Sequence, residues 1–146
     1  MKKHLSLLML VAALLVPWAS RAQETVTIGT GTSTSYYIPF NSLYGYSFTE
    51  EVYPASAINV AGSITKVRFH LGQSNTAAQT NSITLYMKNV TRSSFSSTTD
   101  IEPVTAGDIV YSGSWTIPAN YTGWVEIELD NPFDYDGTSN LMVAMH

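Results

Sequence analysis

The feature that most constrains the fold is a period-two alternation of apolar and polar residues in three separate segments. In residues 64–71, every second residue from Val67 is apolar and the residues between are basic. Similar alternation occurs in residues 83–88 and 125–129. Because successive side chains of a β-strand point to opposite faces, the pattern predicts strands with one buried and one solvent-facing side.

Weaker strand signals, rich in Thr, Tyr, Val and Ile, surround these three segments. They lie near residues 25–28, 45–53, 109–115 and 140–145. Polar segments with turn-forming residues, expected to be loops, occupy 72–82, 91–100 and 131–139. No sustained apolar repeat has helical spacing. The sequence therefore predicts an all-β, two-sheet antiparallel β-sandwich, jelly-roll-like, in one module over residues 23–146.

The N-terminal 22 residues have the layout of a secretory signal peptide. Lys2 and Lys3 precede an apolar run over residues 5–16, and small residues precede the expected cut between Ala22 and Gln23. The run is shorter than the roughly 20 residues that span a bilayer, so we expect no membrane span once the signal is removed. Export to the cell surface or secretion follows from this interpretation.

Charge and cysteine content exclude several classes of function. Residues 23–146 contain four basic and eleven acidic side chains, a net charge of −7. Such a chain cannot build the basic stripe that binds nucleic-acid phosphates. The chain has no cysteine, which excludes a lipid-anchored lipoprotein, thiol catalysis and cysteine-ligated zinc. Strand pairing and packing alone must hold the fold.

The chain ends on an apolar run, residues 141–145, followed only by His146. Because termini are usually more polar, we expect either a C-terminally truncated module or the first module of a longer protein. In either case the strand at 140–145 is expected to have an open edge.

One candidate ligand-binding site is formed by Trp124, Glu126 and Glu128, which share the predicted outward face of the strand at 125–129. An exposed ring beside two acceptors suits a sugar. Alternatively, the ring is one of many aromatic side chains that stabilise the sheet by cross-strand pairing. The set includes Tyr36, Tyr37, Tyr44, Tyr46, Tyr53, Trp115 and Tyr121.

The same sequence favours no catalytic site. Glu126 and Glu128 are a carboxylate pair, as in glycosidases, but glycosidase acids face each other across a cleft and these two lie on one solvated strand face. Histidine is scarce, because His4 leaves with the signal, His146 is terminal and His70 lies between polar neighbours. We therefore expect that the chain is not an enzyme.

A candidate calcium site consists of Asp130, Asp134 and Asp136, with Asn131 nearby, in the expected loop before the last strand. Calcium takes six to eight oxygen ligands, which carboxylates and carbonyls in one loop can supply. The alternative is that Asp136 and Gly137 form a tight turn. No other cofactor is expected.

Several segments resemble β-sandwich modules of Bacteroidetes-type secreted and surface proteins. They are residues 27–32, 36–40, 44–47, 62–67, 83–87, 110–113 and 132–141. Such modules are similar to the adhesin-like jelly rolls of gingipain and hemagglutinin proteins. The resemblance implies adhesion or carbohydrate association rather than a reaction.

Together these observations predict an adhesin-like binding module that recognises a glycan, or a protein of a host or cell surface. The alternative is a non-catalytic spacer that positions a downstream enzymatic or adhesive domain. The oligomeric state is left open by the sequence.

Overall fold

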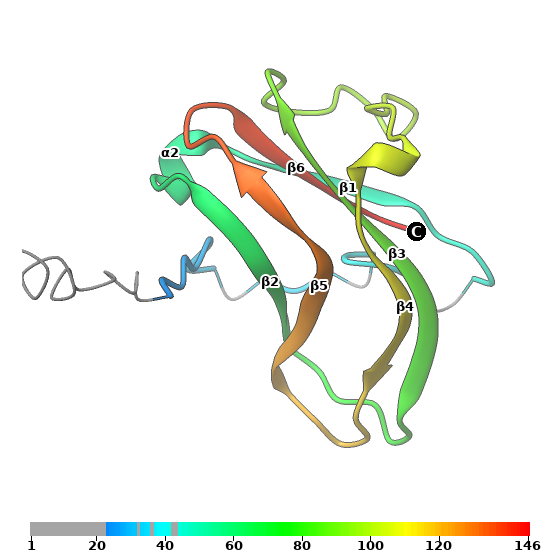
Figure 1. Ribbon diagram of the computed structural model, residues 1–146. Coiled ribbons are helices and arrows are strands. Elements are labelled where there is room, and N and C mark those ends of the chain that lie inside the picture. The colour runs from blue at the N-terminus through cyan, green and yellow to red at the C-terminus, as the bar shows by residue number, and fades with distance from the viewer. Residues whose placement is uncertain (1–22, 32, 36, 42–43) are drawn as a thin grey trace, which may run out of the picture.

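The computed structural model describes residues 23–31, 33–35, 37–41 and 44–146. Its strands are β1 (Thr49–Tyr53), β2 (Gly62–Leu71), β3 (Gln79–Val90), β4 (Ile109–Ile117), β5 (Gly123–Tyr135) and β6 (Asn140–Met145). The short helix α2 (Ala55–Ile58) and the 3₁₀ turn η1 (Ala106–Asp108) complete the elements. A four-stranded sheet of order β1-β6-β3-β4 faces a two-stranded sheet of β2 and β5 (Figure 1). All strand pairs are antiparallel, so the all-β two-sheet prediction is confirmed.

The three segments with the clearest alternation form β2, β3 and β5, as predicted. The weaker signals at 109–115 and 140–145 correspond to β4 and β6, and β1 begins later than expected. The strand predicted at 25–28 is wrong, because these residues are exposed and pair with no strand. The predicted loop at 131–139 is partly wrong, because β5 continues to Tyr135.

The main core lies between the two sheets. Its most buried side chains include Leu85 and Met87 of β3, Ile127 of β5 and Met145 of β6. Trp115 of β4 is 5% exposed, and its ring meets Phe40 and Phe69 edge-on at centroid distances of 5.8 and 6.0 Å. The buried residues 83, 85 and 87 of β3 and 125, 127 and 129 of β5 follow the period-two rule.

Side chains join the two sheets where β4 and β5 meet. The Trp115 indole Nε1 donates to the carbonyl oxygen of Glu126 at 3.2 Å, and the Asp130 carboxylate accepts from the Ser112 amide at 3.1 Å. Each bond satisfies a backbone group at the edge of a strand, where strand pairing does not continue from one sheet to the other. These contacts fix the two-stranded sheet against the larger one.

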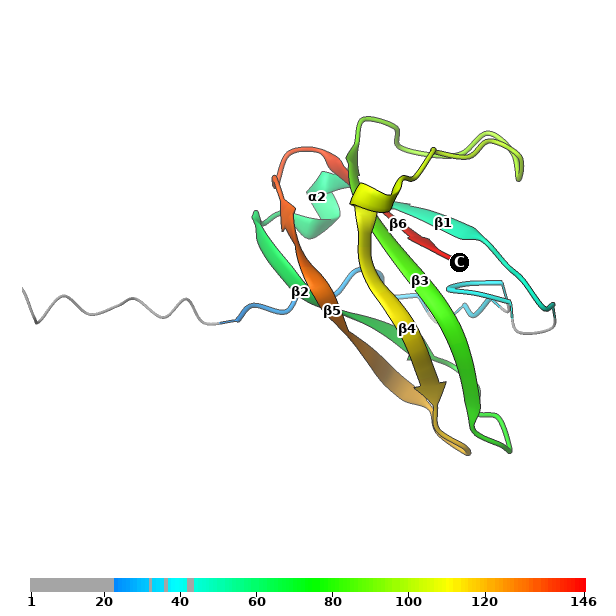
Figure 2. The ribbon, with the colours of Figure 1, turned by 45° about the vertical axis from the view of Figure 1, so that its right-hand side comes forward.

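A second, smaller core lies on the outer side of the four-stranded sheet. Met142 and Ala144 of β6 are completely buried there, together with Val90. Val104, from the segment 91–105 that follows β3, packs against them. In Figure 2 this segment lies beyond the four-stranded sheet, on the side away from β2. We call it the covering segment.

The open edge expected for the last strand is not present. β6 lies inside the sheet and pairs with β1 on one side and with β3 on the other. Residues 141–145 are apolar because both faces of β6 are covered, one by each core.

Candidate functional site

The outward face of the two-stranded sheet brings the three predicted ligand-binding residues together. In the β2–β5 register, Lys66 lies opposite Glu128, Arg68 opposite Glu126 and His70 opposite Trp124. The period-two alternation puts all six side chains on the side away from the core. We call these six residues the ladder face.

Glu126 is at the centre of an ion-paired triad on this face. Its two carboxylate oxygens accept hydrogen bonds from Lys66 Nζ and from Arg68 Nε, each at 2.8 Å. The bond from Lys66, and then that from Arg68, lowers the pKa of Glu126, and the same contact raises the pKa of Lys66. Its two basic partners therefore favour the ionised form of Glu126.

Trp124 is held in place but is accessible. Its side chain is 47% exposed, and the His70 ring meets it at 5.1 Å with an angle of 76° between the ring planes. Its backbone carbonyl accepts a 3.0 Å hydrogen bond from the Tyr121 hydroxyl. Gly123, at φ +112°, makes the turn into β5 that an L side chain would strain. These contacts hold the backbone at the start of β5, where the Trp124 ring is attached.

Of the predicted aromatic residues that the structure describes, Tyr121 contacts Trp124 through its hydroxyl group, and the others have different surroundings. Trp115 is buried in the core, and Tyr53 is half-buried and bonds to Glu51. Tyr37, Tyr44 and Tyr46 are exposed in the segment before β1. Tyr36 lies outside the described residues.

The three aspartates of the predicted calcium site have separate surroundings. Asp130 and Asp134 both lie in β5, four positions apart along the strand. Asp130 bonds to Ser112 of β4, and Asp134 lies opposite Ser63 of β2.

Asp136 closes a turn, as the alternative interpretation predicted. Its Oδ1 accepts from the amides of Thr138 and Ser139 at 2.7 Å each, and bonds to Ser139 contribute most to lowering its pKa to about 2. Among the described residues, no group of three or more His, Cys, Asp or Glu side chains is arranged to hold a metal ion. We therefore do not place a calcium ion at these aspartates.

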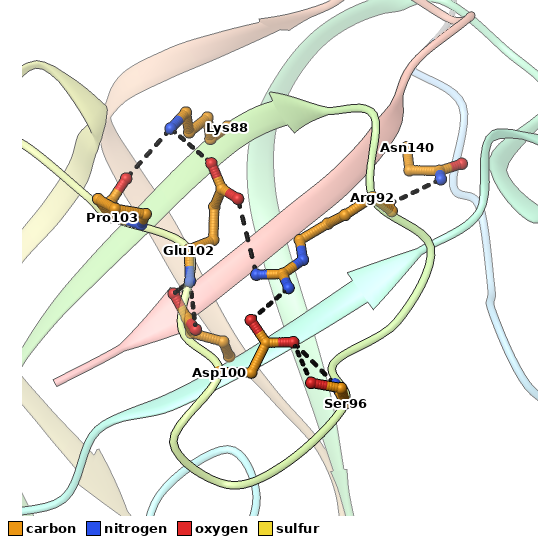
Figure 3. A network of polar contacts seen from close by, with 8 residues as sticks. Lys88, Arg92, Ser96, Asp100, Glu102, Pro103 and Asn140 are labelled. Atoms are coloured by element: carbon orange, nitrogen blue, oxygen red, sulfur yellow. Dashed lines mark hydrogen bonds and ion pairs between the residues drawn. The ribbon is translucent and has the colours of Figure 1, made fainter.

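A polar network that the sequence analysis did not identify holds the covering segment (Figure 3). Arg92 donates to Asp100 at 2.6 Å and lies 3.6 Å from Glu102, while Lys88 donates to Glu102 at 2.9 Å. The Arg92 guanidinium also lies 4.3 Å above the ring of Phe95. The pairing with Arg92, followed by bonds from Ser96, lowers the pKa of Asp100 to about 2.

Glu50 of β1 joins the same network from the sheet. Its carboxylate accepts from the Glu102 amide at 3.1 and 3.2 Å, and burial raises its pKa. These contacts connect the covering segment to β3 through Lys88 and to β1 through Glu50. In the sequence, the only sign of this network was the presence of charged residues in a segment otherwise typical of a loop.

Comparisons with known proteins return no match. No family description, no curated protein and no solved structure is similar enough to the chain to assign it. The resemblance to adhesin-like modules therefore stays a prediction. Within the described residues, no helix has the length and apolar character needed to cross a bilayer.

Proposed function

We propose that the chain is a non-catalytic, adhesin-like binding module that recognises carbohydrate with the ladder face. The observation that carries the proposal is the accessible Trp124 ring at one end of a row of ion-paired side chains. We infer from the signal-like N-terminus that the module acts outside the cytoplasm, either secreted or on the cell surface.

The arrangement suits a sugar because a sugar has both apolar and polar surfaces. An indole ring stacks on the C–H face of a pyranose. The hydroxyl groups at the sugar's edge need donors and acceptors, and the ladder face has both in Arg68 and Glu126. Because these two side chains already hold each other in one geometry, less conformational entropy is lost when a ligand binds.

The carboxylates of the ladder face support binding rather than hydrolysis. Inverting and retaining glycosidases each need a carboxylic acid that donates a proton to the leaving group. Glu126 has the opposite property, because its two basic partners favour its ionised form. Glu128 lies two residues further along the same strand and points the same way. Neither faces a partner acid across a cleft.

The test is a glycan array probed with residues 23–146, which contain every described contact. We expect binding to a subset of glycans, and Trp124→Ala should weaken it at least about tenfold, or 1.4 kcal/mol. The matched control is Tyr46→Ala, which removes a ring that is 86% exposed on a different part of the module. If the folded protein binds no glycan, or if Trp124→Ala and Tyr46→Ala behave alike, the proposal is wrong.

The spacer hypothesis is the second candidate, and the edge-on contact between His70 and Trp124 favours it. Aromatic pairs across two strands stabilise sheets without any ligand. Under this hypothesis Trp124→Ala lowers the free energy of unfolding by roughly 0.2–1 kcal/mol and changes no binding. Chemical denaturation of the same variant measures that loss beside the array.

A further inference from the structure

Two of the four basic side chains in residues 23–146 are surrounded by acids on the covered face. Lys88 donates to Glu102, while Arg92 pairs with Asp100 and lies near Glu102 (Figure 3). Glu50 supplies a third carboxylate, whose charge acts on Arg92. With every group ionised, this cluster has one more negative than positive charge. It therefore has no positive charge to spare for an anion.

The other two basic side chains lie on the ladder face, where the balance is reversed. Lys66 and Arg68 share one carboxylate, that of Glu126, so this triad has one more positive than negative charge. Glu128 offsets the excess at the far end, because it lies opposite Lys66 and four positions along β5 from Trp124. The positive charge that remains toward the indole ring is that of Arg68.

Arg68 has hydrogen-bond donors that its partners do not use. Its side chain is 49% exposed, the largest fraction among the four basic side chains. Its Nε donates to one oxygen of Glu126, and the other oxygen accepts from Lys66. Among the described residues, neither Nη group of Arg68 has a hydrogen-bond partner. The planar guanidinium can therefore donate to both oxygens of a further carboxylate.

Arg68 and Trp124 are diagonal neighbours on the ladder face, because Arg68 lies opposite Glu126 and Trp124 lies opposite His70. Diagonal positions across two strands are roughly 7–8 Å apart, within reach of long side chains. In the described part of the chain, the cation that lies above an aromatic ring is Arg92 and not Arg68. A pyranose stacked on Trp124 can therefore direct a group outside its ring toward the guanidinium.

We propose that the ladder face recognises carbohydrates that carry a carboxylate, such as uronic acids and sialic acids. The sugar ring stacks on Trp124, and the carboxylate accepts hydrogen bonds from the Nη groups of Arg68. Carboxylate recognition rests on the proposed function, since the same face binds the sugar. It adds a requirement for charge, because a neutral sugar would leave the Nη groups to water.

The net charge of −7 in residues 23–146 is compatible with an acidic ligand of this size. At physiological ionic strength, interactions between exposed charges are largely screened beyond about 8 Å. A single carboxylate beside Arg68 therefore interacts mainly with Arg68. A longer polyanion would extend over the other acids of the module and be repelled by them.

The test compares glycans that differ in one kind of group only. On the array, oligogalacturonate is printed beside its methyl ester, sialyllactose beside lactose, and sulfated glycans beside their unsulfated forms. We expect the protein to bind carboxylated glycans at least about tenfold more tightly than their neutral counterparts. Equal binding of both members, or a preference for sulfate alone, would overturn carboxylate recognition and leave the proposed function standing. Binding of no glycan at all would overturn both.

A cycle between protein and ligand locates the contact. Arg68→Met should weaken binding of the carboxylated glycan at least about tenfold and cause no comparable loss for its neutral counterpart, because the lost interaction needs both groups. The matched control is Ser114→Asp, an exposed position of β4 in the other sheet, which changes the net charge by the same amount. This control should leave both affinities nearly unchanged.

Arg68→Lys separates the planar donors from the charge, because lysine keeps the charge without the fork. We expect it to weaken binding of the carboxylated glycan, with circular dichroism and the unfolding midpoint like those of the wild type. Equal losses for the acidic and the neutral glycan in Arg68→Met would show that Arg68 does not contact the carboxylate. A loss in Ser114→Asp as large as that in Arg68→Met would show that only the overall charge matters. Either result would overturn the proposal.

Discussion

The two outward faces of the sandwich use similar ion pairs in opposite ways. On the ladder face, Glu126 lies between Lys66 and Arg68, and all three side chains are about one-third to one-half exposed. On the other face, Arg92 lies between Asp100 and Glu102 within the covering segment, and their side chains are only 21–29% exposed.

The difference lies in what surrounds the charges. A surface ion pair gains little over the hydration of its separated partners, so the ion pairs of the ladder face contribute little to the stability of the fold. The network around Arg92 is closed over a small apolar core, and removing one member leaves the others without compensation. The proposed binding therefore concerns the uncovered face, whereas the ion pairs of the covered face support the structure.

The largest expected effect is on the core beneath the covering segment. Met142 is completely buried there, so Met142→Ala should lower the free energy of unfolding by about 2–5 kcal/mol through lost burial and a residual cavity. Urea denaturation monitored by circular dichroism measures the change. The contrast between the two faces would be wrong if Met142→Ala lowered the free energy of unfolding by no more than Trp124→Ala on the exposed face.

The next effect concerns the covering segment itself. Arg92→Met removes the cation that pairs with Asp100 and Glu102, and these acids would then repel one another and Glu50. We expect faster hydrogen exchange of amides in residues 91–105 and a lower melting temperature. Arg68→Met is the control, because it removes one basic partner on the exposed face. Equal exchange in the two variants would show that Arg92 does not hold the segment.

Acid should destabilise the covered face over a defined pH range. The pKa of Asp100 falls from 3.8 to about 2 on folding, so the folded state favours the ionised form. The corresponding stability is present above about pH 4 and is lost as the pH falls through about 2. Asp136 contributes with the same sign.

Glu50 acts in the opposite direction, because its pKa is raised and its folded form binds a proton more readily. Denaturation midpoints measured between pH 2 and 5 should therefore fall less steeply in Asp100→Asn than in the wild type, and least in Asp100→Asn with Asp136→Asn. Parallel curves for all three proteins would contradict this assignment.

The smallest effect on stability should come from the ladder face. Glu126→Gln removes the charge between Lys66 and Arg68, but the side chains are solvated and their pairing contributes little to folding. We expect Glu126→Gln to have nearly the same unfolding midpoint as the wild type, both in low salt and in high salt. A loss comparable to that of Arg92→Met would mean that the two faces do not differ in the way described.

The sequence predicted the elements whose signal is local. β2, β3 and β5 each contain a segment of alternating apolar and polar residues, and alternation is a property of the segment alone. The outward position of Trp124, Glu126 and Glu128 follows from the same property. The place of β6 between β1 and β3 does not, because pairing depends on contacts between residues far apart in the chain, such as Thr49 and Met145. The segment 25–28 shows the opposite error. Its composition favours a strand, but no neighbouring strand pairs with it among the described residues.

The loop predicted at 131–139 was partly wrong for a related reason. Pro132 and the surrounding polar residues are typical of a turn, yet β5 runs through them. The register between β2 and β5 is irregular at this point, passing from Ile64 opposite Phe133 to Lys66 opposite Glu128. A proline, which lacks an amide donor, is tolerated in a strand at such an irregularity. Asp130 and Asp134 therefore lie in a strand rather than in a loop, and a sequence does not reveal where a register shifts.

The position of β6 also determines when the fold can form. Of the six strands, β6 is the last to be synthesised, yet β1 and β3 meet only through it. The pairing of Thr49 with Met145 closes a loop that contains most of the described residues. Such distant contacts form slowly, because the chain loses the entropy of loop closure before the contacts can stabilise the fold. Until residue 140 emerges from the ribosome, the four-stranded sheet has no centre. Any factor that captures the nascent chain before that point meets a chain that still lacks the pairs of β6 with β1 and β3.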